Sequence, residues 1–481
     1  MRSRFHVDLL SQDEVERIHQ STMAVLERIG IAVGSEPVLT RLAKAGARVD
    51  LEAGRVRFPP AMVQEAIARV PRAFVMAARD PTCDLEIDGS AGYLSTDGTP
   101  AHVLDLDTGE RRPPTTADFE ASMLLADALP EIAFTWPTFA ISDVPPRLQP
   151  IEQAYLQLAR CTKHAQPNEV ITPQDARATV EMAWVIAGGD AELHRRPLIS
   201  SYQCAISPLT YEGAAIEAAV EFANAGIPAG FVSMAVATAS APTTLAGHLV
   251  LVSAEILGGI VMLETLVPGA PTFYGPYEAF MDLASGDLDP AWGGEDVLFK
   301  LAAAQLARRY DLPINIMAFG SGASSPDWQA GAQDALSLMG VWLAGSADLV
   351  AAAGGLHGSS VFSLEQLALE AELFGIACRM AEGFSVTEED LAVPAIEDVG
   401  PGGNFLGHAH TLRHMRERTS PPSFVRGAWE DWNAKGRPEP KERARELVHR
   451  ILAEHRPEPL DEAVDRELRA IVDHRRRELK G

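Results

Sequence analysis

One stretch of the sequence decides the interpretation of the fold. It reads Leu349-Val-Ala-Ala-Ala-Gly-Gly-Leu-His-Gly-Ser-Ser-Val-Phe362. Its five apolar residues predict a short buried strand that ends at a pair of glycines. Glycine there permits a positive φ or a close approach of the backbone to a ligand. The turn carries one imidazole, His357, and serines that can cap the next helix. This pattern is typical of an active-site floor, and equally of a strand-to-helix turn with an incidental histidine.

Upstream of this stretch, short apolar runs alternate with longer helical segments. Eight such strand–helix units predict a (β/α)8 TIM barrel over residues 91–385. An open, doubly wound sheet is the alternative, but no Gly-x-Gly-x-x-Gly or Walker-type loop follows any expected strand. The expected strands are Gly92–Ser95, Ile132–Trp136, Glu169–Thr172, Leu198–Gln203, Ala229–Met234, Pro271–Tyr274, Ile314–Ala318 and Leu349–Ala353.

The two flanks of the barrel differ from it in composition. Residues 1–90 predict a small α+β region that begins with a helix, in which Ser11 and Glu14 form a capping box. Residues 386–481 predict an irregular segment followed by two charged helices. We expect these helices to lie on the surface or at an oligomer contact, and we expect a homo-oligomer.

The overall charge restricts the classes of partner. The chain has 481 residues and a formal net charge of −25, so it is not expected to bind nucleic acid or an anionic membrane. Four scattered cysteines and the lack of a signal-peptide pattern predict a cytoplasmic protein with no zinc site. The apolar run Leu245–Val267 contains His248, Glu255 and Glu264, which favours a buried helix over a membrane span.

Aromatic residues gather just past several expected strand ends, where a barrel of this kind has its active site. A quaternary ammonium group is bound by several aromatic faces, each contributing about 0.5–2 kcal/mol. An acidic protein with such a cavity suits a methylated amine. Packing between strands and helices is the competing explanation for every one of these rings. The candidate cage residues are Trp136, Tyr202, Tyr274, Tyr277 and Phe319, with His357 as the candidate catalytic residue.

Several motifs together resemble one family. They include Leu94-Ser-Thr-Asp-Gly-Thr-Pro100, Asp105–Pro113, Thr116-Ala-Asp-Phe119, Thr162-Lys-His164, Asp327-Trp-Gln-Ala-Gly-Ala-Gln333, Gly400-Pro-Gly-Gly-Asn-Phe-Leu406 and His410-Thr-Leu-Arg-His414. On these motifs the chain resembles the trimethylamine:corrinoid methyltransferase family along nearly its whole length. Archaeal trimethylamine enzymes of that family carry pyrrolysine in the barrel. This chain carries none, so it resembles the non-pyrrolysine branch, whose characterised members demethylate glycine betaine and related betaines.

The resemblance implies transfer of a methyl group from a quaternary amine to the Co(I) corrinoid of a partner protein. The leaving group is then a neutral tertiary amine, so no general acid is required, and the protein positions and dehydrates the substrate. We expect no tightly bound cofactor and no metal on this chain, because the corrinoid (cobalamin) arrives with the partner. His357 would orient the substrate carboxylate or contact the corrinoid. For that carboxylate, Lys163 and Arg308 are further candidates.

Two other functions remain open from the sequence. The same barrel could pass the methyl group directly to tetrahydrofolate, or it could bind a betaine without turning it over. A barrel lyase or aldolase is disfavoured, because no lysine stands at an expected strand end to form a Schiff base.

Overall fold

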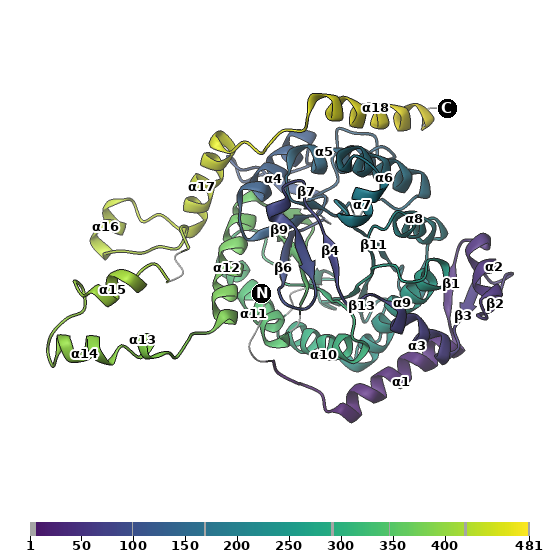
Figure 1. The fold of residues 1–481 in the computed structure, drawn as a ribbon, viewed down its shortest axis with the longest axis horizontal. Coiled ribbons are helices and arrows are strands. Elements are labelled where there is room, and N and C mark those ends of the chain that lie inside the picture. The colour runs from purple at the N-terminus through teal and green to yellow at the C-terminus, as the bar shows by residue number, and fades with distance from the viewer. Residues whose placement is uncertain are drawn as a thin grey trace.

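Eight parallel strands form the wall of a barrel in the computed structural model, which describes residues 6–98, 100–167, 170–289, 293–345, 347–417 and 421–479. Regular pairing joins them into two sheets, and parallel bridges at Ala165–Ile199 and Tyr274–Ile314 connect these sheets at both edges. The ring is therefore complete, and Figure 1 shows it end-on. In ring order the strands are β6 (Tyr93–Thr96), β9 (Ile132–Thr135), β10 (His164–Ala165), β11 (Ser201–Cys204), β13 (Ala229–Ala237), β14 (Tyr274–Met281), β16 (Asn315–Met317) and β17 (Leu349–Ala353).

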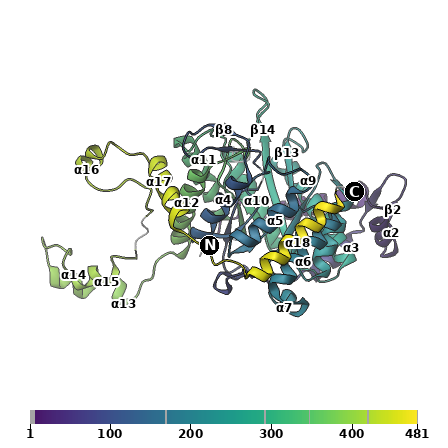
Figure 2. The ribbon, with the colours of Figure 1, turned by 90° about the horizontal axis from the view of Figure 1, so that it is seen from above.

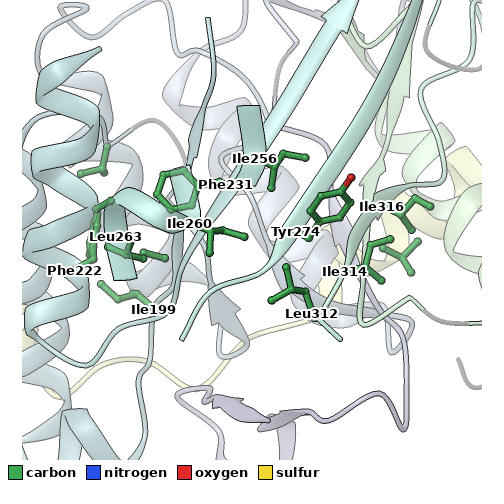
Figure 3. Packing of buried hydrophobic residues seen from close by; sticks show 14 of the residues in the cluster. Ile199, Phe222, Phe231, Ile256, Ile260, Leu263, Tyr274, Leu312, Ile314 and Ile316 are labelled. Carbon is green, nitrogen blue, oxygen red and sulfur yellow. The ribbon is translucent and has the colours of Figure 1, made fainter. Parts of the chain in front are cut away.

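A helix follows each of these strands and covers the outside of the barrel, which confirms the predicted (β/α)8 fold. Large apolar side chains fill the layer between strands and helices, as Figure 3 shows around Phe231, Ile260 and Ile314. The helices are α4 (Thr116–Ala128), α5 (Gln149–Arg160), α6 (Pro173–Ala187), α8 (Gly213–Asn224), α9 (Leu245–Leu266), α10 (Gly294–Tyr310), α11 (Trp328–Ala344) and α12 (Leu364–Glu382), with a short α7 (Asp190–Arg195) and the strand β12 (Thr210–Tyr211) in the loops.

Helix α9 is the one described helix that is long and apolar enough to cross a membrane. Its most apolar window is 83% buried inside the protein, because α1, α3 and β13 pack around it. Burial by the rest of the fold thus accounts for its composition, and its acidic residues Glu255 and Glu264 are buried with it.

The N-terminal region packs its helices on the outside of the barrel against α9, and its last hairpin closes the end at which the barrel strands begin (Figure 1). Ser11 and Glu14 form the expected capping box at the start of the first helix. Met76, Leu85 and Ile87, from a hairpin of two short strands, join the apolar cluster inside the barrel. The elements are α1 (Gln12–Arg28), β1 (Ile31–Val33), α2 (Glu36–Lys44), β2 (Arg48–Asp50), β3 (Arg55–Arg57), α3 (Pro60–Arg69), β4 (Phe74–Met76), the 3-10 helix η1 (Pro81–Cys83) and β5 (Leu85–Ile87).

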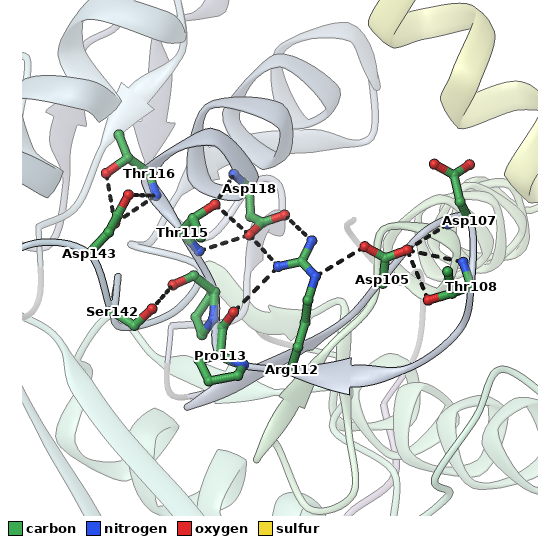
Figure 4. A network of polar contacts seen from close by, with 11 residues as sticks. Asp105, Asp107, Thr108, Arg112, Pro113, Thr115, Thr116, Asp118, Ser142 and Asp143 are labelled. Carbon is green, nitrogen blue, oxygen red and sulfur yellow. Dashed lines mark hydrogen bonds and ion pairs between the residues drawn. The ribbon is translucent and has the colours of Figure 1, made fainter.

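A small sheet lies at the opposite end, above the mouth of the barrel. The insertion after β6 supplies β7 (His102–Leu104) and β8 (Arg111–Arg112), and the loop after β17 supplies β18 (Gly355–Leu356) and β19 (Val361–Phe362). Arg112 fixes this insertion to the start of α4, because its guanidinium bonds both Asp105 (3.0 Å) and Asp118 (2.7 Å) (Figure 4). The loops after the first and last strands are therefore tied together.

Two expected strands need correction. The third strand is His164–Ala165 instead of Glu169–Thr172; Glu169 lies outside the described residues, and Thr172 caps α6. The sixth strand begins at Tyr274, where the expected Pro271–Tyr274 ended, and continues to Met281. Both errors move residues relative to the mouth of the barrel, which matters for the site.

The C-terminal region leaves the barrel and returns to it. Four short helices, α13 (Glu388–Leu391), α14 (Val393–Val399), α15 (Ala409–His414) and α16 (Trp429–Ala434), project from the barrel side (Figures 1 and 2). Helix α17 (Pro440–Glu454) then packs on α12 and α4, and α18 (Glu462–Glu478) packs on α5 and α6. As expected, these last two helices lie on the surface, each burying only a narrow apolar stripe.

Candidate active site

Three aromatic side chains from different strands meet inside the barrel near its mouth. The Trp136 ring, just past β9, lies 5.1 Å from the Tyr202 ring of β11 and 6.2 Å from the Tyr277 ring of β14, measured between centroids. All three side chains are buried. They come from widely separated parts of the sequence, so the closed barrel is what brings them together. We call Trp136, Tyr202 and Tyr277 the aromatic trio.

A chain of hydrogen bonds holds Trp136 in place. Its indole Nε1 donates to Gln166 Oε1 at 2.6 Å, and Gln166 Nε2 donates to Ser200 Oγ at 2.7 Å. His164 completes the chain, with Nε2 2.8 Å from Ser200 Oγ and Nδ1 2.7 Å from the carbonyl oxygen of Ala77. All these side chains are buried, so the donors and acceptors are satisfied without solvent.

The chemistry of these partners determines the tautomer of His164. A carbonyl oxygen can only accept, so Nδ1 carries the proton and Nε2 of the neutral ring accepts from the Ser200 hydroxyl. Burial lowers the pKa of His164 to about 4, which keeps the ring neutral at physiological pH. His164 is therefore a fixed support for Ser200, Gln166 and Trp136, and it does not exchange protons with a substrate.

Tyr277 differs from Trp136 because no hydrogen-bond partner for its hydroxyl is found among the described residues. Burial raises the pKa of Tyr277 well above its usual value, and the nearby Cys204 and Asp97 raise it further. The hydroxyl therefore remains protonated and can donate. A buried polar group without a partner is uncommon in folded proteins and marks a place for a ligand or water.

Asp97 follows β6 and is also buried at this end of the barrel. The backbone N–H of Gly98 donates to its Oδ1 at 2.6 Å, and its own N–H donates to the carbonyl of Ala353 at 2.7 Å. A Cβ at position 355 would overlap the Asp97 carboxylate, so the second glycine after β17 is needed for this approach. The second glycine of the quoted stretch thus makes room for an acidic side chain.

His357 lies on the loop between β18 and β19, and its side chain is exposed. Its backbone has a φ of 51° and donates to the carbonyl of Ala323 at 2.8 Å, while Nδ1 lies 3.2 Å from Ser324 Oγ. These contacts attach it to the loop after β16. The position is on the mouth side of the barrel, as expected, but the ring is not part of the apolar cluster that contains the aromatic trio.

The structure places the two other aromatic candidates apart from the trio. Tyr274 is buried among the apolar side chains between the barrel wall and the helices (Figure 3). Its hydroxyl lies 2.7 Å from Ser253 Oγ, and its ring centroid lies 5.9 Å from that of Tyr310. Phe319 is buried in the same apolar layer as Tyr274. Three of the five predicted cage residues are therefore brought together.

Neither cation suggested for a substrate carboxylate points to the trio. Lys163 Nζ donates to the backbone carbonyls of Ala126 and Leu129 at 2.8 and 2.5 Å. The Arg308 guanidinium pairs with Asp8 and with a carbonyl at the end of α11. In the ranges that the structure describes, no group of three or more His, Cys, Asp or Glu side chains is arranged to hold a metal ion.

Comparison with known proteins identifies the family. The profile of the trimethylamine methyltransferase family (MTTB) matches residues 1–480. The chain belongs to this family. It is 32% identical to the trimethylamine methyltransferase MttB of Desulfitobacterium hafniense over 445 residues, which cover 92% of this chain and 89% of that one. A glycine betaine methyltransferase from another strain of that species is 31% identical over 451 residues, covering 93% of each chain.

The resemblance inferred from the motifs is thus confirmed, and the chain is a methyltransferase of this family. Among solved structures, the Methanosarcina barkeri monomethylamine methyltransferase aligns with 94% of this chain and 89% of its own, with a TM-score of 0.54 and 12% identity. At that identity the similarity concerns the fold alone, and it agrees with the barrel described above.

His164, Gln166 and Ser200 were missed as site residues by sequence reasoning. The signal was present in Thr162-Lys-His164, a short polar motif that stood out only through the family resemblance. The strand β10 has only two residues, His164 and Ala165, which is too short to show an alternation of apolar and polar residues. The nearby apolar pair Val170-Ile171 was therefore predicted as the strand instead.

Proposed function

We propose that the protein transfers a methyl group from a quaternary amine, glycine betaine or a related betaine, to the Co(I) corrinoid of a partner protein. The observation that carries the proposal is the aromatic trio, which gathers three electron-rich rings at the active-site end of the barrel. A glycine betaine methyltransferase among the relatives supports the substrate class.

The proposed substrate position follows from the charges at the mouth. Rings attract a cation through their faces, and removal of water makes this attraction stronger. The Asp97 carboxyl group lies close to Tyr277. The trimethylammonium group would therefore lie against Trp136, Tyr202 and Tyr277, with the Tyr277 hydroxyl free to donate to a polar group of the substrate.

This site needs no acid for the reaction. A quaternary amine leaves as a neutral tertiary amine, so no proton has to be delivered. The neutral His164 and the strongly bound proton of Tyr277 agree with such chemistry. The chain's own residues bind the cation, exclude water and direct one methyl group toward the open end of the barrel.

The methyl acceptor would approach from that open end. A Co(I) corrinoid supplies the nucleophile, and we propose that it arrives on a partner protein and is not held tightly by this chain. Met234, on the inward face of β13, is 43% exposed, and Cys204 at the end of β11 is exposed too. The mouth is thus accessible from outside, as such an acceptor requires.

The assay that tests this proposal follows methyl transfer to cob(I)alamin, with glycine betaine and trimethylamine as separate donors. We expect turnover with glycine betaine. Activity with tetrahydrofolate as the only acceptor would instead favour direct transfer to folate. Tight betaine binding by calorimetry, without turnover by any corrinoid, would make the protein a binding protein.

His357 has its own test, since we propose that it orients the substrate or receives the corrinoid. His357→Ala should lower the transfer rate about 5- to 30-fold, the loss of about 1–2 kcal/mol expected of one positioning contact, while leaving the unfolding midpoint nearly unchanged. His357→Asn is the matched control for the backbone, because asparagine tolerates a positive φ. A variant that unfolds at room temperature, or one with full activity, would remove His357 from the site.

A further inference from the structure

One buried asparagine of the barrel wall makes no side-chain hydrogen bond in the part of the chain that the structure describes. Asn315 is the first residue of β16, and it is fully buried. Among the described residues, neither its Nδ2 nor its Oδ1 has a partner. An amide has two hydrogens and two lone pairs to satisfy, and burial without partners is costly. Such a group marks a place that a ligand or water fills.

The side chain of Asn315 faces the inside of the barrel. Successive residues of a strand point to opposite faces of the sheet. Ile316 packs in the layer between strands and helices (Figure 3), whereas Met317 belongs to the apolar cluster that contains the aromatic trio. Asn315 therefore shares the inward face with Met317. Because β16 begins at Asn315, its amide lies deeper in the barrel than Met317, toward the end that the N-terminal hairpin closes.

Strand pairing places Asn315 near Tyr277, whose hydroxyl also lacks a partner among the described residues. A parallel bridge joins Tyr274 of β14 to Ile314, so Gly275 lies beside Asn315. Tyr277 follows two residues further along β14, on the same inward face. Two residues of a strand span about 6.6 Å and neighbouring strands lie about 4.8 Å apart, so the two backbones are about 8 Å apart. A small ligand can contact both side chains across this separation.

The chemistry of the two groups indicates what such a ligand carries. The Tyr277 hydroxyl keeps its proton, because burial raises the pKa of Tyr277 well above its usual value, and Asn315 Nδ2 has two hydrogens to donate. A carboxylate is the matching group, because it only accepts. Both donors are neutral, so the ligand has to balance the negative charge itself. A betaine does this with its own ammonium group.

We propose that Asn315, together with the Tyr277 hydroxyl, binds the carboxylate of the substrate and so selects a betaine over methylamines that lack this group. The proposal explains why a carboxylated substrate needs neither Lys163 nor Arg308, both of which are bonded elsewhere. It rests on the proposed function, because it takes the quaternary amine to lie at the aromatic trio.

The contact would also orient the substrate. Asn315 lies toward the closed end of the barrel, whereas Trp136 follows the end of β9 on the mouth side. A carboxylate at Asn315 would therefore be the deepest part of the substrate. The trimethylammonium group would lie above it, against the aromatic trio, with a methyl group toward the open end. Asn315 is thus assigned to substrate binding and selection, with no part in the transfer step itself.

Calorimetry of the full chain tests the proposal, with glycine betaine and tetramethylammonium as separate ligands and no methyl acceptor. We expect the wild type to bind glycine betaine more tightly. Asn315→Leu should weaken glycine betaine about 10- to 100-fold, as expected for the loss of a hydrogen bond to a charged group. Its affinity for tetramethylammonium should be nearly unchanged. Asn315→Asp keeps the side-chain shape without the amide donor, and it should weaken glycine betaine as well.

Ser201→Ala is the matched control. Ser201 is buried and its hydroxyl has no partner among the described residues, but it precedes Tyr202 on β11 and so faces away from the barrel interior. This variant should leave both affinities unchanged. The thermal midpoint of Asn315→Leu should not fall, because no hydrogen bond within the protein is lost. A markedly lower midpoint would make Asn315 a structural residue and overturn the proposal.

The pattern of affinities separates this proposal from the proposed function. An unchanged affinity for glycine betaine in both Asn315 variants, or an equal loss for both ligands, would overturn the carboxylate site while methyl transfer could still occur. Selective loss of glycine betaine binding, in a protein that transfers no methyl group to cob(I)alamin, would support the carboxylate site and contradict the transfer. A wild type that binds neither ligand would contradict both.

Discussion

The two faces of strand β14 carry two buried tyrosines with opposite surroundings. Tyr277 faces the inside of the barrel, beside Trp136, and none of the residues that the structure describes bonds its hydroxyl. Tyr274 lies an odd number of residues away, so it faces the helices, where its hydroxyl bonds Ser253 and its ring packs on Tyr310. The protein therefore satisfies the hydroxyl of Tyr274, whereas a ligand could supply a partner for the hydroxyl of Tyr277.

The buried ionisable groups also differ between the two faces of the barrel wall. On the outer face, Lys300 of α10 lies 3.0 Å from Glu278 of β14 and also contacts Asp296 and Ser337. Burial raises the pKa of Glu278 well above its usual value even with Lys300 beside it. On the inner face, the buried Asp97 carboxyl group lies near Tyr277 of the trio, and no lysine or arginine is shown beside it among the described contacts.

The largest expected effect is a loss of stability when the buried ion pair on the outer face of β14 is disrupted. Lys300→Met leaves Asp296 buried without a cation, and removal of one partner from a buried pair costs about 3–5 kcal/mol. We expect a correspondingly lower urea midpoint, measured by circular dichroism. The matched variant Lys300→Met/Asp296→Asn removes both charges and should recover most of the loss. A single variant as stable as the wild type would show that the pair does not support the wall.

The second prediction concerns a buried carboxyl group on the outer side of the barrel wall, one oxygen of which lacks a hydrogen-bond partner among the described residues. Glu264 of α9 accepts from the N–H of Gly269 at 2.8 Å, but its other carboxylate oxygen has no hydrogen-bond partner within the described part of the chain. Burial raises the pKa of Glu264 to about 7, so the folded protein holds a proton that the unfolded chain, near 4.5, releases. Stability should therefore fall as the pH rises from about 4.5 to about 7.

Glu264→Gln removes this dependence. At pH 8 it should exceed the wild type in unfolding free energy by about 1–3 kcal/mol, since each pKa unit corresponds to about 1.4 kcal/mol. Near pH 4.5 the two proteins should be nearly equal. Urea unfolding at both pH values measures the difference. Parallel pH profiles for the wild type and the variant would contradict the raised pKa.

The order of helices and strands could be predicted from the sequence. The face of the sheet to which each strand residue points could not be predicted in every case. The helices were predictable because caps such as Ser11 with Glu14 and long apolar periods mark them. Tyr274 was assigned to the mouth because the expected strand ended there. The strand in fact begins at Tyr274, which moves this residue to the lower part of the wall and turns it outward. A single sequence does not fix strand register, because tertiary pairing does.

The third prediction tests the inner face through Trp136. Trp136→Leu removes one ring from the trio and leaves Gln166 Oε1 without its donor. We expect KM for the quaternary amine to rise about 5- to 30-fold, the equivalent of about 1–2 kcal/mol for a desolvated cation–π contact. Trp184→Leu is the control, because Trp184 lies partly exposed on α6. An unchanged KM in the Trp136 variant would place the substrate elsewhere.

The smallest effects come from the two tyrosine hydroxyls, and they separate the faces most directly. Tyr274→Phe removes a hydroxyl that the protein uses, so it should cost about 1 kcal/mol of stability and leave KM unchanged. Tyr277→Phe removes a hydroxyl that the protein does not use, so stability should be unchanged or slightly higher. If the ligand accepts from that hydroxyl, its affinity should fall about 5-fold. Urea midpoints and KM values for both variants distinguish the two outcomes. A stability loss in Tyr277→Phe with an unchanged KM would mean that the inner face, like the outer one, is completed by the protein itself, and the trio would then be core packing.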